Sequence, residues 1–136
     1  MSRKQLKLRV FANMVEDLRV LSTCKRMQTA CIIIDPDFDL FVTGYNGWPH
    51  GFDHQNCDGD PCGFVHAELN ACFKLGVMKA FGKQDLICIA SHDPCVRCAQ
   101  SILQQRIITE VYILHTHKCK DGVQLLKDGG INVAYL

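Results

Sequence analysis

The residues most able to do chemistry in this chain are one histidine, one glutamate and two cysteines in two short motifs. His66 and Glu68 lie in His-Ala-Glu, while Cys95 and Cys98 lie in Pro-Cys-Val-Arg-Cys, which begins 28 residues after His66. Catalytic zinc typically has three protein ligands and leaves its fourth position to water. His66, Cys95 and Cys98 would supply such a ligand set, and Glu68 would remain as a base. The two motifs together predict metal-assisted hydrolysis.

The spacing within each motif suits the start of a helix. Cys95 and Cys98 are three positions apart, so they project from one side of a helical turn, and Pro94 is favoured at a helix start because its missing N–H needs no partner there. A helix N-terminus also lowers the pKa of a cysteine, which binds metal as a thiolate. Alone, C-x-x-C could be a redox pair and H-x-E could arise by chance. The two motifs in this order favour a metal site.

Composition favours a small-molecule substrate. The chain has 136 residues, which fits one domain over residues 1–136, and its net charge is only +1, with 15 basic and 14 acidic residues. Proteins that bind long nucleic acids usually carry a basic excess or stripe, so we expect no such partner. We expect no membrane partner either, because no apolar run approaches the roughly 20 residues of a membrane span.

The chain contains nine cysteines, which could be reduced or paired in disulfides depending on the cellular compartment. Disulfides are the rule in secreted proteins, but the N-terminal segment carries charges in place of the apolar core of a signal peptide. We therefore expect reduced cysteines and a cytoplasmic location. Cys31, Cys72 and Cys88 lie in apolar segments and are expected to act as small buried hydrophobes.

Hydrophobic periodicity predicts the order α-β-β-α-β-α-β-α-β. The second half alternates strands and helices, which is typical of parallel strands joined by right-handed crossovers. The fold class is therefore predicted to be α/β, a three-layer α/β/α sandwich on a five-stranded mixed sheet. The first helix is expected to bury Val10, Met14, Leu18 and Leu21. The expected helices are residues 4–23, 65–78, 94–105 and 121–127; the expected strands are residues 29–34, 40–45, 85–90, 110–114 and 131–135, with an irregular loop at 46–63.

Three segments carry a resemblance to a known family. They are His-Ala-Glu-Leu-Asn-Ala at 66–71, Ser-His-Asp-Pro-Cys-Val-Arg-Cys-Ala at 91–99 and Gly-Tyr-Asn-Gly-Trp-Pro-His-Gly at 44–51. The first two are similar to the H-x-E and P-C-x-x-C signature of zinc-dependent nucleobase deaminases. With the third, the chain resembles the deoxycytidylate (dCMP) deaminases of the cytidine deaminase superfamily, from about residue 10 to its end.

The resemblance implies hydrolysis of dCMP to dUMP and ammonia, which would supply dUMP for thymidylate synthesis. One catalytic Zn²⁺ would be held by His66, Cys95 and Cys98 and would lower the pKa of its water to about 7. Glu68 would take the proton, hydroxide would attack C4 of cytosine, and Glu68 would pass protons to N3 and the leaving amine.

The same resemblance implies a set of substrate-binding residues. Asn46 would bond to the deoxyribose or the base, and the backbone around Ser91 would accept a hydrogen bond from the exocyclic amine. Lys25 or Arg26 would hold the 5′-phosphate. After the fourth strand, where many family members carry a Tyr-Asp or Tyr-His pair, this chain departs from the pattern, and His117 would stack on the base instead. Each also has a structural interpretation: Asn46 could serve a turn, Lys25 and Arg26 could be solvated charges, and His117 could simply end a strand.

A second, structural Zn²⁺ is a further hypothesis. His50, His54, Cys57 and Cys62 crowd one polar loop, and Cys24 lies just before the first strand. A loop without its own core gains most from a metal, although scattered Cys and His in a cysteine-rich chain need no metal.

Other functions remain open at this point. The chain could act on dCTP as well as dCMP, or on another cytosine or adenine nucleotide, because the fold and the zinc do not fix the base. It could instead be an inactive, zinc-stabilised binding module, although Glu68 would then have no use. By resemblance, a homo-oligomer, often a hexamer, and dCTP and dTTP as effectors are also expected.

Overall fold

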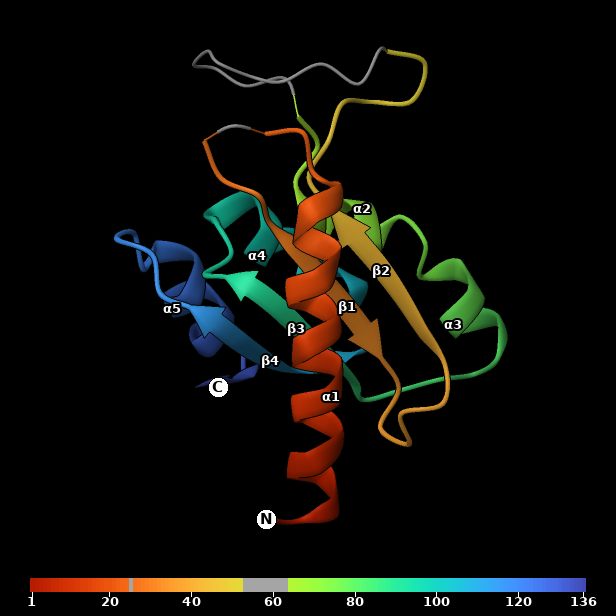
Figure 1. The fold of residues 1–136 in the computed structure, drawn as a ribbon. Helices are drawn as coiled ribbons and strands as arrows, with labels where there is room; N and C mark the ends of the chain where they lie inside the picture. Colours follow the sequence, from red (N-terminus) through yellow and green to blue (C-terminus); the bar gives the residue numbers. More distant parts are fainter. Residues whose placement is uncertain (25, 53–63) are drawn as a thin grey trace.

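A mixed sheet of five strands forms the centre of the fold (Figure 1). A computed structural model describes residues 1–24, 26–52 and 64–136. The strand order is β2-β1-β3-β4-β5, with β1 antiparallel to β2 and β3, and with β3, β4 and β5 parallel. The predicted five-stranded mixed sheet is confirmed. The strands are β1 (Ala30–Ile34), β2 (Phe41–Tyr45), β3 (Leu86–His92), β4 (Ile108–His115) and β5 (Asn132–Tyr135).

Helices cover both faces of the sheet, so the predicted three-layer sandwich is also confirmed (Figure 1). One face packs against the first helix alone, and the other packs against the remaining helices. The helices are α1 (Arg3–Leu18), the 3₁₀ turn η1 (Arg19–Leu21), α2 (Ala67–Cys72), α3 (Gly76–Ala80), α4 (Val96–Gln105) and α5 (Asp121–Asp128).

The central strands are apolar on both faces. All five residues of β1 and six of the seven in β3 are buried, as expected for strands covered by helices on both sides. The free thiols of Cys31, Cys72 and Cys88 lie in this core, as predicted. Burial raises the pKa of Cys72 to about 12, so this thiol stays neutral and packs as a hydrophobe.

The predicted buried stripe of the first helix is right for Met14 and Leu18, which are partly buried and pack against the core, and wrong for Val10 and Leu21. Val10 is 56% exposed and Leu21 is 54% exposed, whereas Leu8, Ala12 and Val15 are buried. The buried residues follow the helical spacing of three or four positions that defines one face. Val10 lies between Leu8 and Ala12 in the sequence and therefore on another side of α1. The helix also ends earlier than predicted, at Leu18, and passes into η1.

The predicted helix over 65–78 is two helices. The backbone N–H of Lys74 bonds to Ala71 O and that of Leu75 bonds to Cys72 O, both three residues back. Such 3₁₀-type bonds tighten the chain and end α2. Gly76, expected near the end of one helix, begins α3.

A single aspartate organises the turn between β1 and β2. The buried Asp35 accepts hydrogen bonds on Oδ1 from the N–H groups of Asp39 (2.8 Å) and Leu40 (3.0 Å), and Lys83 Nζ lies 3.0 Å from Oδ2. Burial alone would raise the pKa of Asp35, but the Leu40 N–H and the Lys83 ammonium outweigh it and hold this pKa below its ordinary value.

This carboxylate makes the stability of the fold depend on acid. The unfolded chain takes up the proton near pH 4, whereas folded Asp35 takes it up only at lower pH. Its contribution is therefore complete above about pH 5 and is lost as the pH falls through the folded pKa. We expect Asp35→Asn to lower the free energy of unfolding by about 2 kcal/mol at pH 7, because charge-assisted hydrogen bonds are lost.

Urea unfolding at several pH values measures this effect. The difference between the wild-type protein and Asp35→Asn should be constant from pH 7 to about pH 5 and should shrink below about pH 4. Asp39→Asn is a matched control, because Asp39 is exposed in the same turn. A difference that grows on acidification would contradict the assignment.

No helix in the described part of the chain combines the length and apolar character that a membrane span requires.

Candidate active site

The two motifs meet beside the sheet. His66 is the N-cap residue of α2, and Cys95 is the N-cap residue of α4, with Cys98 in the first turn of that helix. His66 Nδ1 lies 3.5 Å from Cys95 Sγ and 3.4 Å from Cys98 Sγ. These three atoms all lie within 4.8 Å of one another. The predicted helix start at Pro94 is displaced by two residues, because α4 begins at Val96.

This arrangement fits a zinc ion. Zinc bonds of about 2.0 Å to nitrogen and 2.3 Å to sulfur, at tetrahedral angles, place the two ligand atoms about 3.6 Å apart. The distances from His66 Nδ1 to the sulfurs of Cys95 and Cys98 are close to this value. One imidazole and two cysteine sulfurs form a three-ligand set, which is typical of a catalytic rather than a structural zinc.

The charges in this site are matched to metal binding. Hydrogen bonds from Cys98 and His66 lower the pKa of Cys95 to about 3, so Cys95 is a thiolate. The neighbouring Cys95 sulfur raises the pKa of Cys98 and, by accepting a hydrogen bond, also raises that of His66. The thiolate of Cys95 is thus hydrogen-bonded to the thiol of Cys98 and to the imidazole of His66. A divalent cation that bound all three side chains would displace the protons of these hydrogen bonds.

Glu68 faces the same site from the second position of α2. It is only 6% exposed, and burial raises its pKa. Glu68, His66 and Cys95 line a cavity of about 400 Å³. A carboxylate that has a raised pKa and lies beside a metal site is suited to take and return protons near neutral pH.

Strand β2 determines where α2 lies. A Cβ atom on Gly44 would lie 2.1 Å from Ala67 O and 2.8 Å from Ala71 N, so only glycine permits this approach. Asn70 Nδ2 donates to Tyr45 O at 2.8 Å, and Lys74 Nζ donates to Thr43 O at 2.6 Å. These contacts fix the helix that carries Glu68.

Asn46 lines the cavity and is 8% exposed. Its Oδ1 accepts from the N–H of Thr29 at 3.0 Å, and its Nδ2 donates to Met27 O at 2.9 Å. The amide group therefore holds the segment before β1, as the structural interpretation expected. An Asn side chain has two donor hydrogens and two acceptor lone pairs, which leaves one of each for a substrate.

Ser91 is fully buried at the end of β3. Its Oγ accepts from the N–H of Ala30 at 3.0 Å and lies 2.9 Å from His92 Nδ1. The hydroxyl thus joins β3 to β1, which leaves only the backbone around Ser91 for the predicted contact with a substrate.

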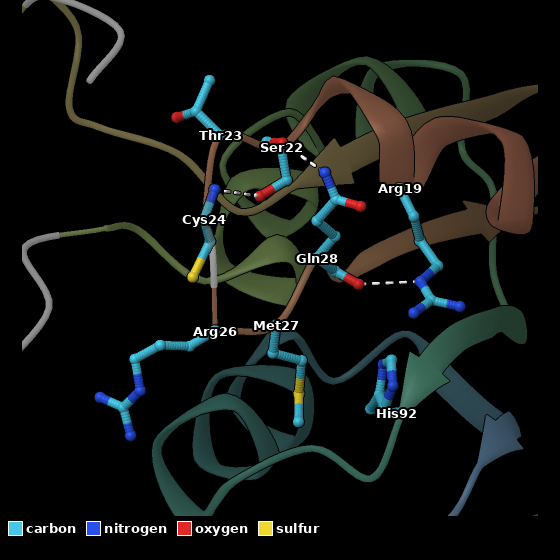
Figure 2. A pocket seen from close by; sticks show the side chains of 8 residues that line it. All are labelled: Arg19, Ser22, Thr23, Cys24, Arg26, Met27, Gln28 and His92. Atoms are coloured by element: carbon cyan, nitrogen blue, oxygen red, sulfur yellow. Dashed lines mark hydrogen bonds between the residues drawn. The ribbon is translucent and has the colours of Figure 1, made fainter. Parts of the chain in front are cut away.

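A second cavity, of about 580 Å³, adjoins the first (Figure 2). Four residues line both cavities: Cys24, Arg26, Met27 and His92. Arg19 lines the second cavity but not the first. Arg19 Nε donates to Gln28 O at 2.8 Å. The predicted phosphate-binding residue Arg26 therefore lies between the two cavities, while Lys25 falls outside the described residues.

His117 also lines the first cavity, as does Cys119. Of the residues considered for a second metal, Cys24 is buried against Phe64, whereas His54, Cys57 and Cys62 lie outside the described residues.

Several cavity residues were not predicted from the sequence: Met27, Thr29, Phe64, His92 and Asp93. His92 and Asp93 lie inside the segment 91–99, so their position next to Cys95 was the available signal. Phe64 stands two residues before His66. Met27 and Thr29 belong to an irregular segment, which has no periodic pattern to place its side chains.

The family sequence profile described as "Cytidine and deoxycytidylate deaminase zinc-binding region" matches residues 4–115. This range contains both motifs of the site. The chain belongs to this family. Residues His66, Cys95 and Cys98 thus form a candidate metal site within a family whose shared region binds zinc.

Individual proteins that are similar to this chain are in line with this family assignment. Deoxycytidylate deaminase of Saccharomyces cerevisiae is 29% identical over 126 residues, covering 82% of this chain, and ComE operon protein 2 of Bacillus subtilis is 33% identical, covering 85%. The chain spans 39% and 64% of the lengths of these two relatives. The apo crystal structure of dCMP deaminase from cyanophage S-TIM5 is 26% identical with a TM-score of 0.82, and both chains are covered completely. A second structure of that phage enzyme, in complex with dCMP and dUMP, superposes with a TM-score of 0.80 at 23% identity.

Proposed function

We propose that this chain hydrolyses dCMP to dUMP and ammonia and so supplies dUMP for thymidylate synthesis. The observation that carries the proposal is the convergence of His66, Cys95 and Cys98, with the buried Glu68 beside them in one cavity. A purely structural metal site has no use for a carboxylate that does not bind the metal. The names of the yeast and phage relatives support dCMP as the substrate.

Different residues of the site carry out different parts of the reaction. His66, Cys95 and Cys98 would hold one zinc ion, which supplies the Lewis acidity that makes water a nucleophile near neutral pH. Glu68 takes one proton from the attacking water and delivers it to N3, and then takes the second proton from the new C4 hydroxyl and delivers it to the departing amine. The C4–N4 bond of the cytosine breaks and a C4–O bond forms, so that one water is consumed for each ammonia released.

The remaining cavity residues would orient the nucleotide. Asn46 offers its spare donor and acceptor to the deoxyribose or base, and the backbone beside Ser91 accepts from the exocyclic amine. Arg26, with Lys25 next to it, supplies positive charge for the 5′-phosphate. His117 also lines the cavity, which supports the proposal that it contacts the base.

Ammonia release from four substrates tests the proposal. We expect zinc-loaded protein to release ammonia from dCMP at least tenfold faster, in terms of kcat/KM, than from deoxycytidine or cytidine, because a charged phosphate contact contributes about 1.5 kcal/mol or more. Equal rates with dCMP and deoxycytidine would contradict a phosphate-binding role for Arg26. No release from any of the four, including dCTP, would favour the inactive binding module.

The adjoining cavity gives a specific reason to include dCTP. It is lined by Arg19 as well as Arg26, so beyond the expected 5′-phosphate it offers volume and a second guanidinium, which pairs with Glu16 at 2.9 Å. Activity on dCTP comparable to that on dCMP would support the second candidate function, a deaminase that accepts both nucleotides.

We further propose that residues 1–136 act as one catalytic domain in a reducing, cytoplasmic environment. The cysteines in the described parts of the chain are all free thiols, which supports this. The structural zinc at Cys24, the hexamer and the response to dCTP and dTTP stay predictions.

A further inference from the structure

Asp93 lies between the last residue of β3 and the Pro94-Cys95 segment, and its side chain is buried. The carboxylate is fully buried, although the residue as a whole is partly exposed and lines the cavity. The exposed part is therefore the main chain. Asp93 thus presents its backbone to the cavity, while its carboxylate is held inside the protein.

Three donors from distant parts of the chain hold this carboxylate. The N–H of His117 donates to Oδ2 at 2.6 Å, the Tyr135 hydroxyl donates to Oδ1 at 2.7 Å, and Lys120 Nζ also bonds to Oδ2. Lys120 Nζ lies 3.3 Å from the Tyr135 hydroxyl and 5.2 Å from the centroid of its ring. The loop after β4, the start of α5 and the end of β5 therefore meet at one buried charge.

The start of α5 makes an independent contact with the same segment. A Cβ atom on Gly122 would lie 2.0 Å from Pro94 O and 2.8 Å from the carbonyl carbon of Cys95. The helix backbone thus packs directly on the peptide that carries the first cysteine. The start of α5 thus contacts Asp93 through Lys120 and the Pro94-Cys95 segment through Gly122.

We propose that Asp93 is a positioning residue whose buried carboxylate, held by Tyr135, Lys120 and the His117 N–H, keeps Cys95 in place for metal binding. A buried carboxylate stays where its donors are, because separation would leave an unpaired charge. Cys95 is only two residues away and is joined to Asp93 through the rigid Pro94. The inference rests on the proposed zinc site, and it adds residues near the C-terminal end of the sequence to the group that shapes this site.

The rate of zinc release tests this role directly. Zinc-loaded protein is mixed with an excess of a chromogenic chelator, and the release of zinc is followed over time. We expect Tyr135→Phe to release zinc about tenfold faster than the wild-type protein, as is typical when a group that orients a metal site is lost. This variant removes one hydroxyl from a ring that is 43% exposed, so the fold should persist.

Tyr112→Phe is a matched control. Tyr112 OH donates to Glu110 Oε2 at 3.0 Å, another hydroxyl-to-carboxylate bond, and packs with α1 on the opposite face of the sheet. Its release rate should equal that of the wild-type protein. Equal rates for Tyr135→Phe, Tyr112→Phe and the wild-type protein would overturn the proposal while leaving the zinc site itself intact.

A second variant separates positioning from general destabilisation. Asp93→Ala should also release zinc faster, and the double variant Asp93→Ala/Tyr135→Phe should be no faster than Asp93→Ala alone, because both changes break the same contact. Multiplied effects would contradict a shared mechanism. Failure of the wild-type protein to bind zinc would instead refute the proposed function.

Discussion

Replacing Glu68 by Gln should lower kcat for dCMP by at least about a thousandfold while leaving the zinc content equal to that of the wild-type protein. General acid and base steps each contribute roughly 10² to 10⁴ in rate, and Glu68 performs more than one of them in the proposed reaction. Glutamine has nearly the same shape but cannot accept the proton. The buried position of Glu68 requires a variant of this shape, because a smaller residue would leave a hole beside the cavity.

Steady-state kinetics with dCMP and elemental analysis of the purified variant measure the two halves of this prediction. Glu110→Gln is the matched control, because Glu110 lies on β4 and pairs with Lys4 at 3.0 Å, outside the cavity. It should keep wild-type kcat and zinc content. A Glu68→Gln protein that retains near-normal turnover would refute the assigned role, and one that loses zinc would make Glu68 part of the metal site instead.

The strands of the fold could be predicted because their signal is local. Strands β1 and β3 are continuous apolar runs, so burial on both faces follows from composition alone. Helix α1 is different, since Leu8 and Val10 are both apolar and only the sheet decides which one is buried. The break after α2 was also hidden, because Phe73 and Val77 continue a helical apolar spacing while being exposed.

The residues of the site also fall into two groups, those that a local sequence pattern predicts and those that it does not. His66, Glu68, Cys95 and Cys98 could be proposed because each pair lies in one short segment whose spacing carries the chemistry. The role of Asp93 could not be proposed from the sequence, because its hydrogen-bond donors His117 and Tyr135 are 24 and 42 residues away along the chain. Contacts over such distances depend on the order of the strands, which no local pattern encodes.

The second large effect is expected at Gly44, where the structure leaves no room for a side chain. A Cβ atom there would collide with Ala67 O at 2.1 Å and with Ala71 N at 2.8 Å. Both are backbone atoms of α2 and cannot rotate away as a side chain could. We expect Gly44→Ala to lower the free energy of unfolding by about 3 kcal/mol, the upper part of the usual range for overpacking.

Activity should fall together with stability, because α2 must move as a whole and it carries Glu68 and follows His66. A shift of about 1 Å in a catalytic group can cost about a hundredfold in rate. Urea unfolding and kcat for dCMP measure the two effects. Gly47→Ala is the control, because a Cβ atom at Gly47 meets nothing within 4 Å; it should be nearly neutral in both. A Gly44→Ala protein as stable and as active as Gly47→Ala would show that the approach of α2 to β2 is not what fixes the catalytic helix.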